Sequence, residues 1–410
     1  MEFTFPHGFL WGTATAAHQV EGGNYYNDNW VIEHIPGTPY ADVSGDACDH
    51  YHRYRDDIRL LADLGFTMYR FSLEWARIEP EEGEFSFAEL EHYRRVLLAC
   101  HEHGITPLVT FHHFTSPRWL AAAGGWESAE TPAKFARYCG RAMAHLGDLI
   151  PVACTMNEVN IGPLVSAIIN PPLRAERQLA WYQAAARQVG SDATTFTPFL
   201  YADDERGREV ILEAHRQATQ AIKAVAPGCK VGLTLAMQDI QAGPGGEEMA
   251  ARMRHQLIDV YLEAVHSDDF IGVQTYSRQR FGPDGPLGSE EGVELTQMGY
   301  EFWPQALEAT VRYASEKTNI PVLVTENGLS TTDDTRRVAY IEQALRGIAA
   351  CLQDGIEVLG YTYWSAMDNF EWSSGYLPTF GLIAVDRKTQ ERILKPSAYH
   401  LGQIARTNGF

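Results

Sequence analysis

Eight short runs of apolar and β-branched residues recur along the chain, and segments with helical periodicity separate most of them. The strand-like runs lie at residues 9–15, 67–73, 106–112, 152–156, 230–236, 270–276, 321–325 and 358–364. The helical patterns lie at residues 56–64, 88–103, 131–147, 207–225, 246–265, 304–317 and 334–352. Because parallel strands need long, usually helical crossovers, this alternation predicts an α/β fold, a closed parallel (β/α)8 or TIM barrel.

The barrel is expected to form one domain over residues 1–410. The chain is 45% hydrophobic, which is enough for a single large core, and it shows no internal repeat, linker or low-complexity tract. Residues 171–204 are less regular and contain the clusters PP, TTFTP and ADDE. We predict a loop with short helices there, lying over the mouth of the barrel.

Charge and cysteine usage restrict the partners and the location that we expect. Asp and Glu number 53 against 33 Lys and Arg, a formal net charge of -20, and such a surface repels phosphate backbones and anionic lipid. We therefore predict no nucleic-acid and no membrane partner. Six scattered cysteines without a CxxC motif indicate reduced thiols. The first residues lack a basic region and a long apolar run, so no signal peptide is expected and the predicted location is cytoplasmic.

Two of the strand-like runs end in glutamate. The segment PVLVTENGLS at 321–330 carries Glu326, and VACTMNEVN at 152–160 carries Glu158. In a TIM barrel, the carboxyl ends of all eight strands meet at the active-site face, so both carboxylates are expected there. Two carboxyl groups at one site are what double-displacement glycoside hydrolysis needs.

The histidine pairs and glycine clusters indicate neither a metal nor a cofactor. His50 and His52 have HxH spacing and His112 precedes His113, but neither stretch brings a third ligand at a recognisable spacing. No strand–GxGxxG–helix unit is present to hold a nucleotide. We expect no metal site and no cofactor.

Seven motifs at the strand ends, taken together, resemble glycoside hydrolase family 1, the β-glucosidase family. They are FPHGFLWGTATAAHQVEG at 5–22, GDACDHYHRYRDDI at 45–58, YRFSLEWARIEP at 69–80, TFHHFTSPRWL at 110–120, TMNEVN at 155–160, VTENG at 324–328 and YWSAMDNFEW at 363–372. The resemblance runs nearly from end to end and implies the barrel fold and glycosidase chemistry.

The resemblance also implies roles for individual residues. Glu326 matches the nucleophile, with Arg70 as its counter-charge and Tyr276 as its hydrogen-bond donor. Glu158 matches the acid/base residue, which must carry a proton in the first step and therefore needs a raised pKa. The residues that match the sugar pocket are Gln19, His113, Asn157, Trp364, Glu371 and Trp372, with Asn157 on the sugar 2-hydroxyl.

Several positions depart from the family pattern. Val159 stands where proline usually follows the acid/base glutamate, and Gln274 stands where asparagine is usual. The segment 237–269 is shorter than usual and 171–204 is longer, which predicts an unusual aglycone side. Glu371 argues against a phospho-sugar substrate because its charge would repel a phosphate. Glu158 argues against the plant thioglucosidases, which lack that residue.

The leading hypothesis is a retaining exo-β-glycosidase that hydrolyses β-D-glucosides, with β-galactosides and β-fucosides as further candidates. A second hypothesis makes transfer to an alcohol or sugar the main reaction, with the same residues. A third is an inactive barrel that only binds sugar, although both carboxylates are retained. The expected partner is a small-molecule β-glycoside; the oligomeric state, the natural aglycone and the preference among sugars stay open.

Overall fold

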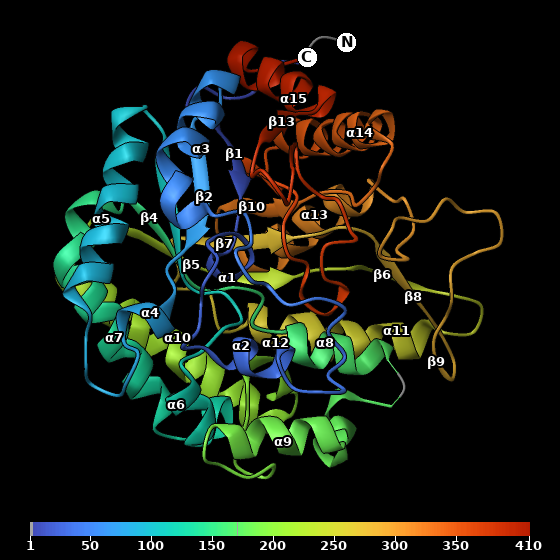
Figure 1. Ribbon diagram of the computed structural model, residues 1–410. Helices are drawn as coiled ribbons and strands as arrows, with labels where there is room; N and C mark the ends of the chain where they lie inside the picture. Colours follow the sequence, from blue (N-terminus) through green and yellow to red (C-terminus); the bar gives the residue numbers. More distant parts are fainter. Residues whose placement is uncertain (1–2, 170) are drawn as a thin grey trace.

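The computed structural model describes residues 3–169 and 171–410. Eight parallel strands close into a barrel, in the order β1-β11-β10-β7-β5-β4-β3-β2 (Figure 1). Their bounds are β1 (Leu10–Ala14), β2 (Met68–Ser72), β3 (Thr106–His112), β4 (Val152–Met156), β5 (Lys230–Ala236), β7 (Phe270–Gln274), β10 (Val322–Asn327) and β11 (Val358–Trp364). The predicted TIM barrel is confirmed, and each predicted strand is present with ends displaced by at most two residues.

Helices surround the barrel, and most of the long ones match the predicted pattern. The long ones are α3 (His50–Leu64), α5 (Phe87–Glu102), α7 (Thr131–Leu146), α10 (Glu205–Val225), α13 (Ala306–Thr318) and α14 (Asp334–Gln353). α3 starts six residues before its prediction, in a polar stretch without apolar periodicity, and α15 (Pro396–Thr407) was not predicted. The predicted helix 246–265 is interrupted by a π-helical turn, η5 (His255–Asp259), between α11 (Glu247–Arg254) and α12 (Val260–Leu262).

None of the helices in the described part of the chain combines the length and apolar character that a bilayer crossing requires. All six cysteines are buried free thiols.

Two small sheets stand outside the barrel, and neither was predicted. One consists of β6 (Asp239–Ala242), β8 (Arg278–Gly282) and β9 (Gly285–Pro286), which project from one side of the molecule (Figure 1). The other pairs β12 (Ile383–Val385) with β13 (Arg392–Leu394). These strands have two to five residues each, so their sequence lacks the alternation that would reveal a strand.

The inside of the barrel is apolar at one level and polar at the next. Five side chains from five strands form a buried apolar cluster: Met68, Leu108, Cys154, Phe270 and Leu323. Side chains two residues apart share one face of a strand, so the next inward positions on β2, β3 and β10 are Arg70, Thr110 and Thr325. The apolar layer therefore closes the barrel below a polar layer nearer the strands' carboxyl ends.

A second hydrophobic cluster supports the rim of the barrel. It joins α2 (Asp28–Glu33) to the segment between β4 and α10, which contains α8 (Ile161–Ile168), η3 (Leu173–Gln178), α9 (Ala180–Gln188) and η4 (Phe199–Tyr201). In Figure 1, α2, α8 and α9 lie together below the barrel as drawn. Its buried members include Ile32, Trp181, Tyr182, Phe196 and Tyr201. Residues 171–204 thus contain short helices with an aromatic core of their own.

Candidate active site

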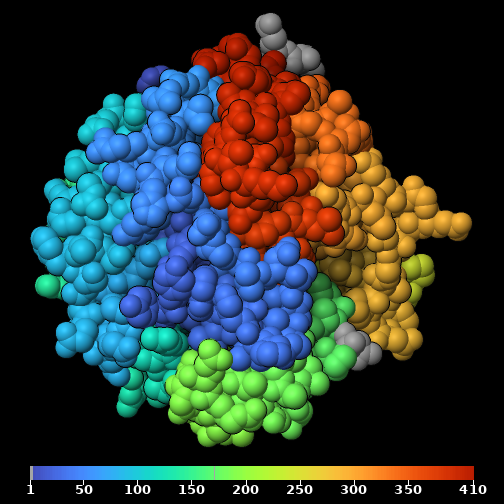
Figure 2. Space-filling view, in the orientation of Figure 1, coloured from blue at the N-terminus to red at the C-terminus, as the bar shows by residue number. Residues whose placement is uncertain are grey.

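A cavity of about 440 Å³ opens at the carboxyl ends of the barrel strands. Its lining comes from all parts of the chain, from Asn29 to Phe380, and includes Asn157, Glu158 and Glu326. On the face shown in Figure 2, the N-terminal segment (blue), the segment around α8 and α9 (green) and the C-terminal segment (red) meet. The rim of the cavity is therefore built from loops that are remote in sequence.

Glu326 lies inside β10, near its carboxyl end, at an irregularity of the strand. The pairing of β10 with both β7 and β11 shifts register after Val324, which indicates a β-bulge. Bulges of this kind redirect a side chain, and they are frequent next to active sites. The Glu326 carboxylate accepts hydrogen bonds from Arg70 Nη1 at 2.5 Å and from the Tyr276 hydroxyl at 2.5 Å.

Arg70 is the centre of the polar layer and is 1% exposed. Besides Glu326, it donates to Thr110 Oγ1 at 3.1 Å, to the Thr325 carbonyl at 3.2 Å and to Asn157 Oδ1 at 2.6 Å. Four acceptors around one guanidinium hold it in a single orientation, and a buried charge is tolerated only when it is paired in this way. Arg70 thus ties β2 to β3, β10 and the loop after β4.

Glu158 follows β4 with a left-handed backbone, at φ 43°. Its side chain lines the cavity and, within the described residues, forms no salt bridge. Burial raises the pKa of Glu158 well above its ordinary value, the charge of Glu326 raises it further, and Arg70 offsets only part of this. Glu158 is thus the carboxyl group of the pair that holds a proton.

Glu326 has the opposite environment. Burial keeps the pKa of Glu326 above its ordinary value, but Arg70 and the Tyr276 hydroxyl offset part of that rise, and Glu158 has no such hydrogen-bonded counter-charge. When two buried carboxyl groups interact, the proton resides on the one without a counter-charge. The geometry therefore favours an ionised Glu326 beside a protonated Glu158.

Asn157 and Gln274 are joined next to these carboxyl groups. Asn157 Oδ1 accepts from Gln274 Nε2 at 2.8 Å as well as from Arg70. No hydrogen bond to a described residue uses Asn157 Nδ2, so that group is available to a ligand in the cavity. Gln274, one of the residues that depart from the family pattern, thus forms a hydrogen bond with Asn157.

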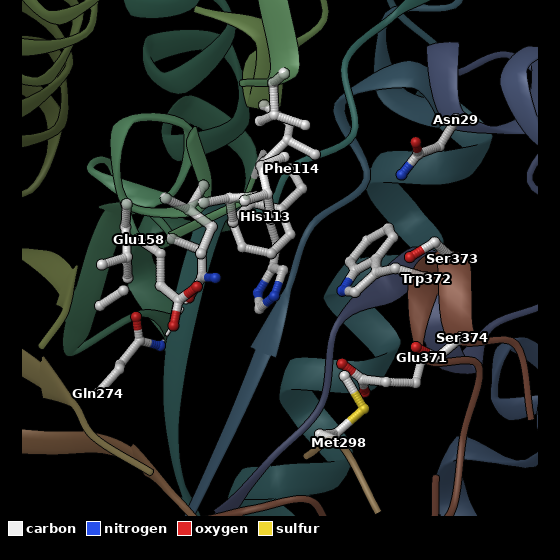
Figure 3. A pocket seen from close by; sticks show the side chains of 18 of the residues that line it. Asn29, His113, Phe114, Glu158, Gln274, Met298, Glu371, Trp372, Ser373 and Ser374 are labelled. Carbon is white, nitrogen blue, oxygen red and sulfur yellow. Dashed lines mark hydrogen bonds between the residues drawn. The ribbon is translucent and has the colours of Figure 1, made fainter. Parts of the chain in front are cut away.

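Aromatic side chains form a further part of the cavity wall. His113 stacks on Trp364 at 5.7 Å between ring centroids and on Trp372 at 6.3 Å. Burial lowers the pKa of His113 well below its usual range, and Arg70 lowers it further, so the ring is neutral. Figure 3 shows Glu158 and Gln274 on one side of the cavity, and Glu371, Trp372 and Met298 across it. Flat apolar faces beside neutral polar groups suit a sugar ring.

Gln19 and Glu371 lie together on the aromatic side of the cavity. Gln19, in α1 (Ala17–Val20), donates through Nε2 to the Phe370 carbonyl at 2.8 Å and to Glu371 Oε2 at 3.4 Å. Its Oε1 atom is buried and has no hydrogen-bond partner among the described residues. Burial and the charge of Glu326 raise the pKa of Glu371 to about 8. Glu371 is therefore mostly a neutral carboxyl group at pH 7, able to donate as well as accept.

The structure brings all ten predicted site residues to this one region. Seven of them stand on or just after the strands β2, β3, β4, β7, β10 and β11; Gln19 comes from α1, and Glu371 and Trp372 come from the segment after β11. Other lining residues could not be selected from the sequence. They include Tyr40, Leu173, Gln238, Met298 and Tyr300, which lie in segments without a motif.

The histidines outside the cavity have structural partners. His50 Nδ1 pairs with Asp57 at 2.8 Å, and His112 Nε2 lies 3.0 Å from Ser116 Oγ. Across residues 3–169 and 171–410, no three His, Cys, Asp or Glu side chains group as metal ligands would. His50 and His112 therefore have hydrogen-bond partners within the protein.

Comparison with known proteins agrees with this geometry. The family model described as glycosyl hydrolase family 1 matches residues 1–272 and 271–410. β-Glucosidase A of Thermotoga maritima is 30% identical, with 99% of this chain and 98% of the relative covered. A bifunctional β-D-glucosidase/β-D-fucosidase of Bifidobacterium breve is 29% identical, with 97% of each chain covered.

A solved structure is more similar still. The β-glycosidase BGL167 is 59% identical and superimposes with a TM-score of 0.96, with 98% of this chain and 97% of the other covered. The strand-end carboxylates, the barrel and these matches lead to one conclusion: the chain belongs to glycosyl hydrolase family 1 and is a β-glycosidase, an enzyme that hydrolyses O-glycosyl bonds.

Proposed function

We propose that this enzyme is a retaining exo-β-glycosidase that hydrolyses β-D-glucosides through a covalent glycosyl-enzyme intermediate. The observation that carries the proposal is the unequal environment of two carboxyl groups at one cavity. Glu326 is paired with Arg70 and Tyr276, whereas Glu158 has no counter-charge of its own. A nucleophile must be ionised and a general acid must be protonated, so the two environments match the two roles.

In the first step, Glu326 attacks the anomeric carbon while the glycosidic C–O bond breaks. Glu158 gives its proton to the leaving oxygen, so the aglycone departs as a neutral alcohol. The sugar is then esterified to Glu326, whose negative charge is gone. Because that charge raised the pKa of Glu158, the pKa now falls and Glu158 stays ionised.

In the second step, water takes the place of the aglycone. Glu158 accepts a proton from this water, the hydroxyl oxygen attacks the anomeric carbon, and the ester to Glu326 breaks. Both carboxyl groups return to their starting states, and two inversions retain the β configuration. This chemistry requires the two carboxyl groups to lie about 5–5.5 Å apart, the spacing of retaining enzymes.

The sugar is assigned to the side of the cavity lined by His113, Trp364, Glu371 and Trp372. Trp364 offers an apolar face, whereas Glu371, His113 and the Nδ2 group of Asn157 offer hydrogen bonds to hydroxyls. β-Fucosides are further candidates, because the name of the Bifidobacterium breve relative includes a fucosidase. β-Galactosides belong in the same test, a panel of aryl β-glycosides.

Variants of the two glutamates test the assignment. Glu326→Ala should nearly abolish turnover, and a 2-deoxy-2-fluoroglucoside should label the wild type but not this variant in a mass spectrum. Glu158→Ala should lose most activity on poor leaving groups and regain part of it with azide on activated ones. Wild-type turnover by Glu326→Ala, or an inverted product by NMR, would end the proposal.

The remaining assignments follow from this proposal. We propose that residues 1–410 act as one catalytic domain, that 171–204 forms part of the aglycone side, and that the enzyme works in the cytoplasm without a metal or cofactor. Transfer to alcohols would use the same residues, and product analysis with and without an added alcohol separates transfer from hydrolysis. An inactive sugar-binding barrel would need neither carboxyl group, whereas this chain places both at the cavity.

A further inference from the structure

The hydroxyl of Thr234, a residue outside the cavity lining, connects Glu158 to Gln274. Thr234 is fully buried in β5, and its Oγ1 accepts the backbone N–H of Glu158 at 2.9 Å. The same hydroxyl lies 3.0 Å from Gln274 Oε1 and 3.2 Å from the Met156 carbonyl. A hydroxyl has one proton, so it donates to one of these two oxygens while it accepts from Glu158.

The backbone of Glu158 needs such a restraint. Its φ of 43° is in the left-handed region, which residues with a Cβ atom rarely adopt. An unfavourable backbone conformation persists only where the surroundings hold it, and such conformations cluster at active sites. If Glu158 relaxed to an ordinary φ, its side chain would leave the cavity that it now lines.

The two departures from the family pattern meet at Thr234. Val159 donates its backbone N–H to the Thr234 carbonyl at 3.2 Å, a bond that proline at position 159 could not make. Gln274 reaches both Thr234 Oγ1 and, through Nε2, Asn157 Oδ1 at 2.8 Å. The loop after β4 is therefore attached to β5 and β7 at three consecutive residues, 157 to 159.

We infer that Thr234 is a positioning residue that holds Glu158 in the orientation needed to deliver its proton to the leaving oxygen. The inference rests on the proposed role of Glu158. Thr234 itself touches no reacting atom. Its hydroxyl acts through its hydrogen bond with the Glu158 backbone. Gln274 contacts both this hydroxyl and Asn157, and so fixes their relative positions.

The test compares leaving groups in the full-length enzyme. Thr234→Val keeps the side-chain shape and removes the hydroxyl. General acid catalysis contributes about 10²–10⁴-fold, so misplacing the acid should lower kcat/KM for phenyl β-glucoside by about 10–100-fold. For 2,4-dinitrophenyl β-glucoside, whose leaving group needs no proton, kcat/KM should stay within about threefold. Thr234→Ser, which restores the hydroxyl, should recover most of the loss.

Two further variants separate a positioning role from general damage to the enzyme. Thr362→Val makes the same change in β11, at a fully buried hydroxyl that bonds to no described residue, and should leave both rates unchanged. Thr234→Val introduced into Glu158→Ala should cause no additional loss on phenyl β-glucoside, because the group that Thr234 positions is gone. If Thr234→Val does not fold, Thr234→Ala replaces it in both measurements.

Several outcomes overturn the inference. Equal losses on both leaving groups, no loss on either, or a further loss in the Glu158→Ala background would show that Thr234 does not act through Glu158. The proposed function has a separate test: Glu158→Ala alone must discriminate between the leaving groups and respond to azide. If that single variant fails, the acid/base assignment falls and the inference with it; if only the Thr234 variants fail, the assignment stands.

Discussion

The guanidinium of Arg70 and the carboxylate of Glu326 form an ion pair at 2.5 Å inside the barrel, although 256 positions separate them in the chain. Arg70 also holds Asn157, which directly precedes Glu158. The Arg70 cation therefore favours the ionised form of Glu326 and, through Asn157, helps to hold the backbone next to Glu158. The geometry of the site depends on the closure of β2 beside β3 and on the placement of β10 across the barrel.

Replacing Arg70 with methionine should raise the pKa of Glu326, because the cation that favours its ionised form is lost. The acid limb of the profile of kcat/KM against pH, which reports the free enzyme, should move to higher pH. We expect kcat/KM at neutral pH to fall at least about 100-fold, since charge-assisted bonds contribute about 1.5–3 kcal/mol each.

Arg392→Met is the matched control for this prediction. Arg392 pairs with Asp57 at 2.8 Å and is also mostly shielded from solvent, with 7% of its side chain exposed against 1% for Arg70, but it lies outside the cavity. Both variants should lose stability, by about 3–5 kcal/mol for a broken buried pair. Only the Arg70 variant should shift the acid limb, and a shift in both would contradict the prediction.

Replacing Gln274 with asparagine should lower kcat/KM, because Asn157, the residue proposed to bind the sugar 2-hydroxyl, would be held less firmly. The shorter amide cannot reach Asn157 Oδ1, which then keeps only Arg70 as a donor. Thr234 can turn its proton to the Met156 carbonyl, so its bond from Glu158 survives. We expect kcat/KM to fall about 10-fold on an aryl β-glucoside, the size of one hydrogen bond.

A 2-deoxyglucoside provides the comparison for Gln274→Asn. This substrate lacks the hydroxyl that Asn157 is proposed to bind, so the variant and the wild type should hydrolyse it at nearly the same rate. An equal loss of kcat/KM on both substrates would show that Gln274 does not act through the contact between Asn157 and the 2-hydroxyl. Melting temperatures measured alongside should stay within a few degrees, because the substitution adds no charge.

Glu371→Gln should change how stability depends on pH. The folded pKa of Glu371 is about 8, above its ordinary value of 4.5, so the folded protein binds more protons than the unfolded chain between these values. Stability then falls as pH rises through this window, because the proton is lost from the unfolded chain first. Glutamine has no such proton.

The measurement is urea unfolding of both proteins at several pH values. The free energy of unfolding of the wild type, relative to Glu371→Gln, should decrease steadily from about pH 5 to pH 8. Most of the contribution of Glu158 cancels in this difference, because burial and Glu326, the larger causes of its raised pKa, are present in both proteins. A difference that is constant with pH would mean that Glu371 titrates normally.

The aglycone side should favour apolar leaving groups. Ile161, Leu164, Val165, Ile169 and Leu173 line the cavity beyond Glu158. Burying one methylene group contributes about 0.8 kcal/mol, so kcat/KM should rise about fourfold per carbon along a series of alkyl β-glucosides until the chain leaves the cavity.

Ile169→Ala provides a test of that surface without disturbing the core. Ile169 is 37% exposed, so its truncation should cost little stability. The variant should reduce kcat/KM for the longer alkyl glucosides and leave methyl β-glucoside unchanged. A flat alkyl series in the wild type would show that the apolar lining does not contact the aglycone.

The barrel could be predicted because its strands are buried on both faces and read as continuous apolar runs. The runs at 106–112 and 358–364 agree with β3 and β11 to the residue. The sheet of β6, β8 and β9 was missed because its two-to-five-residue strands are defined by their partners and not by any period of their own. The π-helical turn at 255–259 was missed for a related reason, since one inserted residue leaves the local composition helical.

What the sequence alone determined is the set of chemical groups at the strand ends: Glu158, Glu326 and the motif residues around them. Tertiary structure decided which of the two carboxyl groups holds the proton, because that depends on whether Arg70 and Tyr276 lie beside it. It also decided that Gln274 still reaches Asn157 and that Thr234 holds the Glu158 backbone. Charge and hydrogen-bond distances across a closed barrel join residues from different strands, and no stretch of sequence encodes those distances by itself.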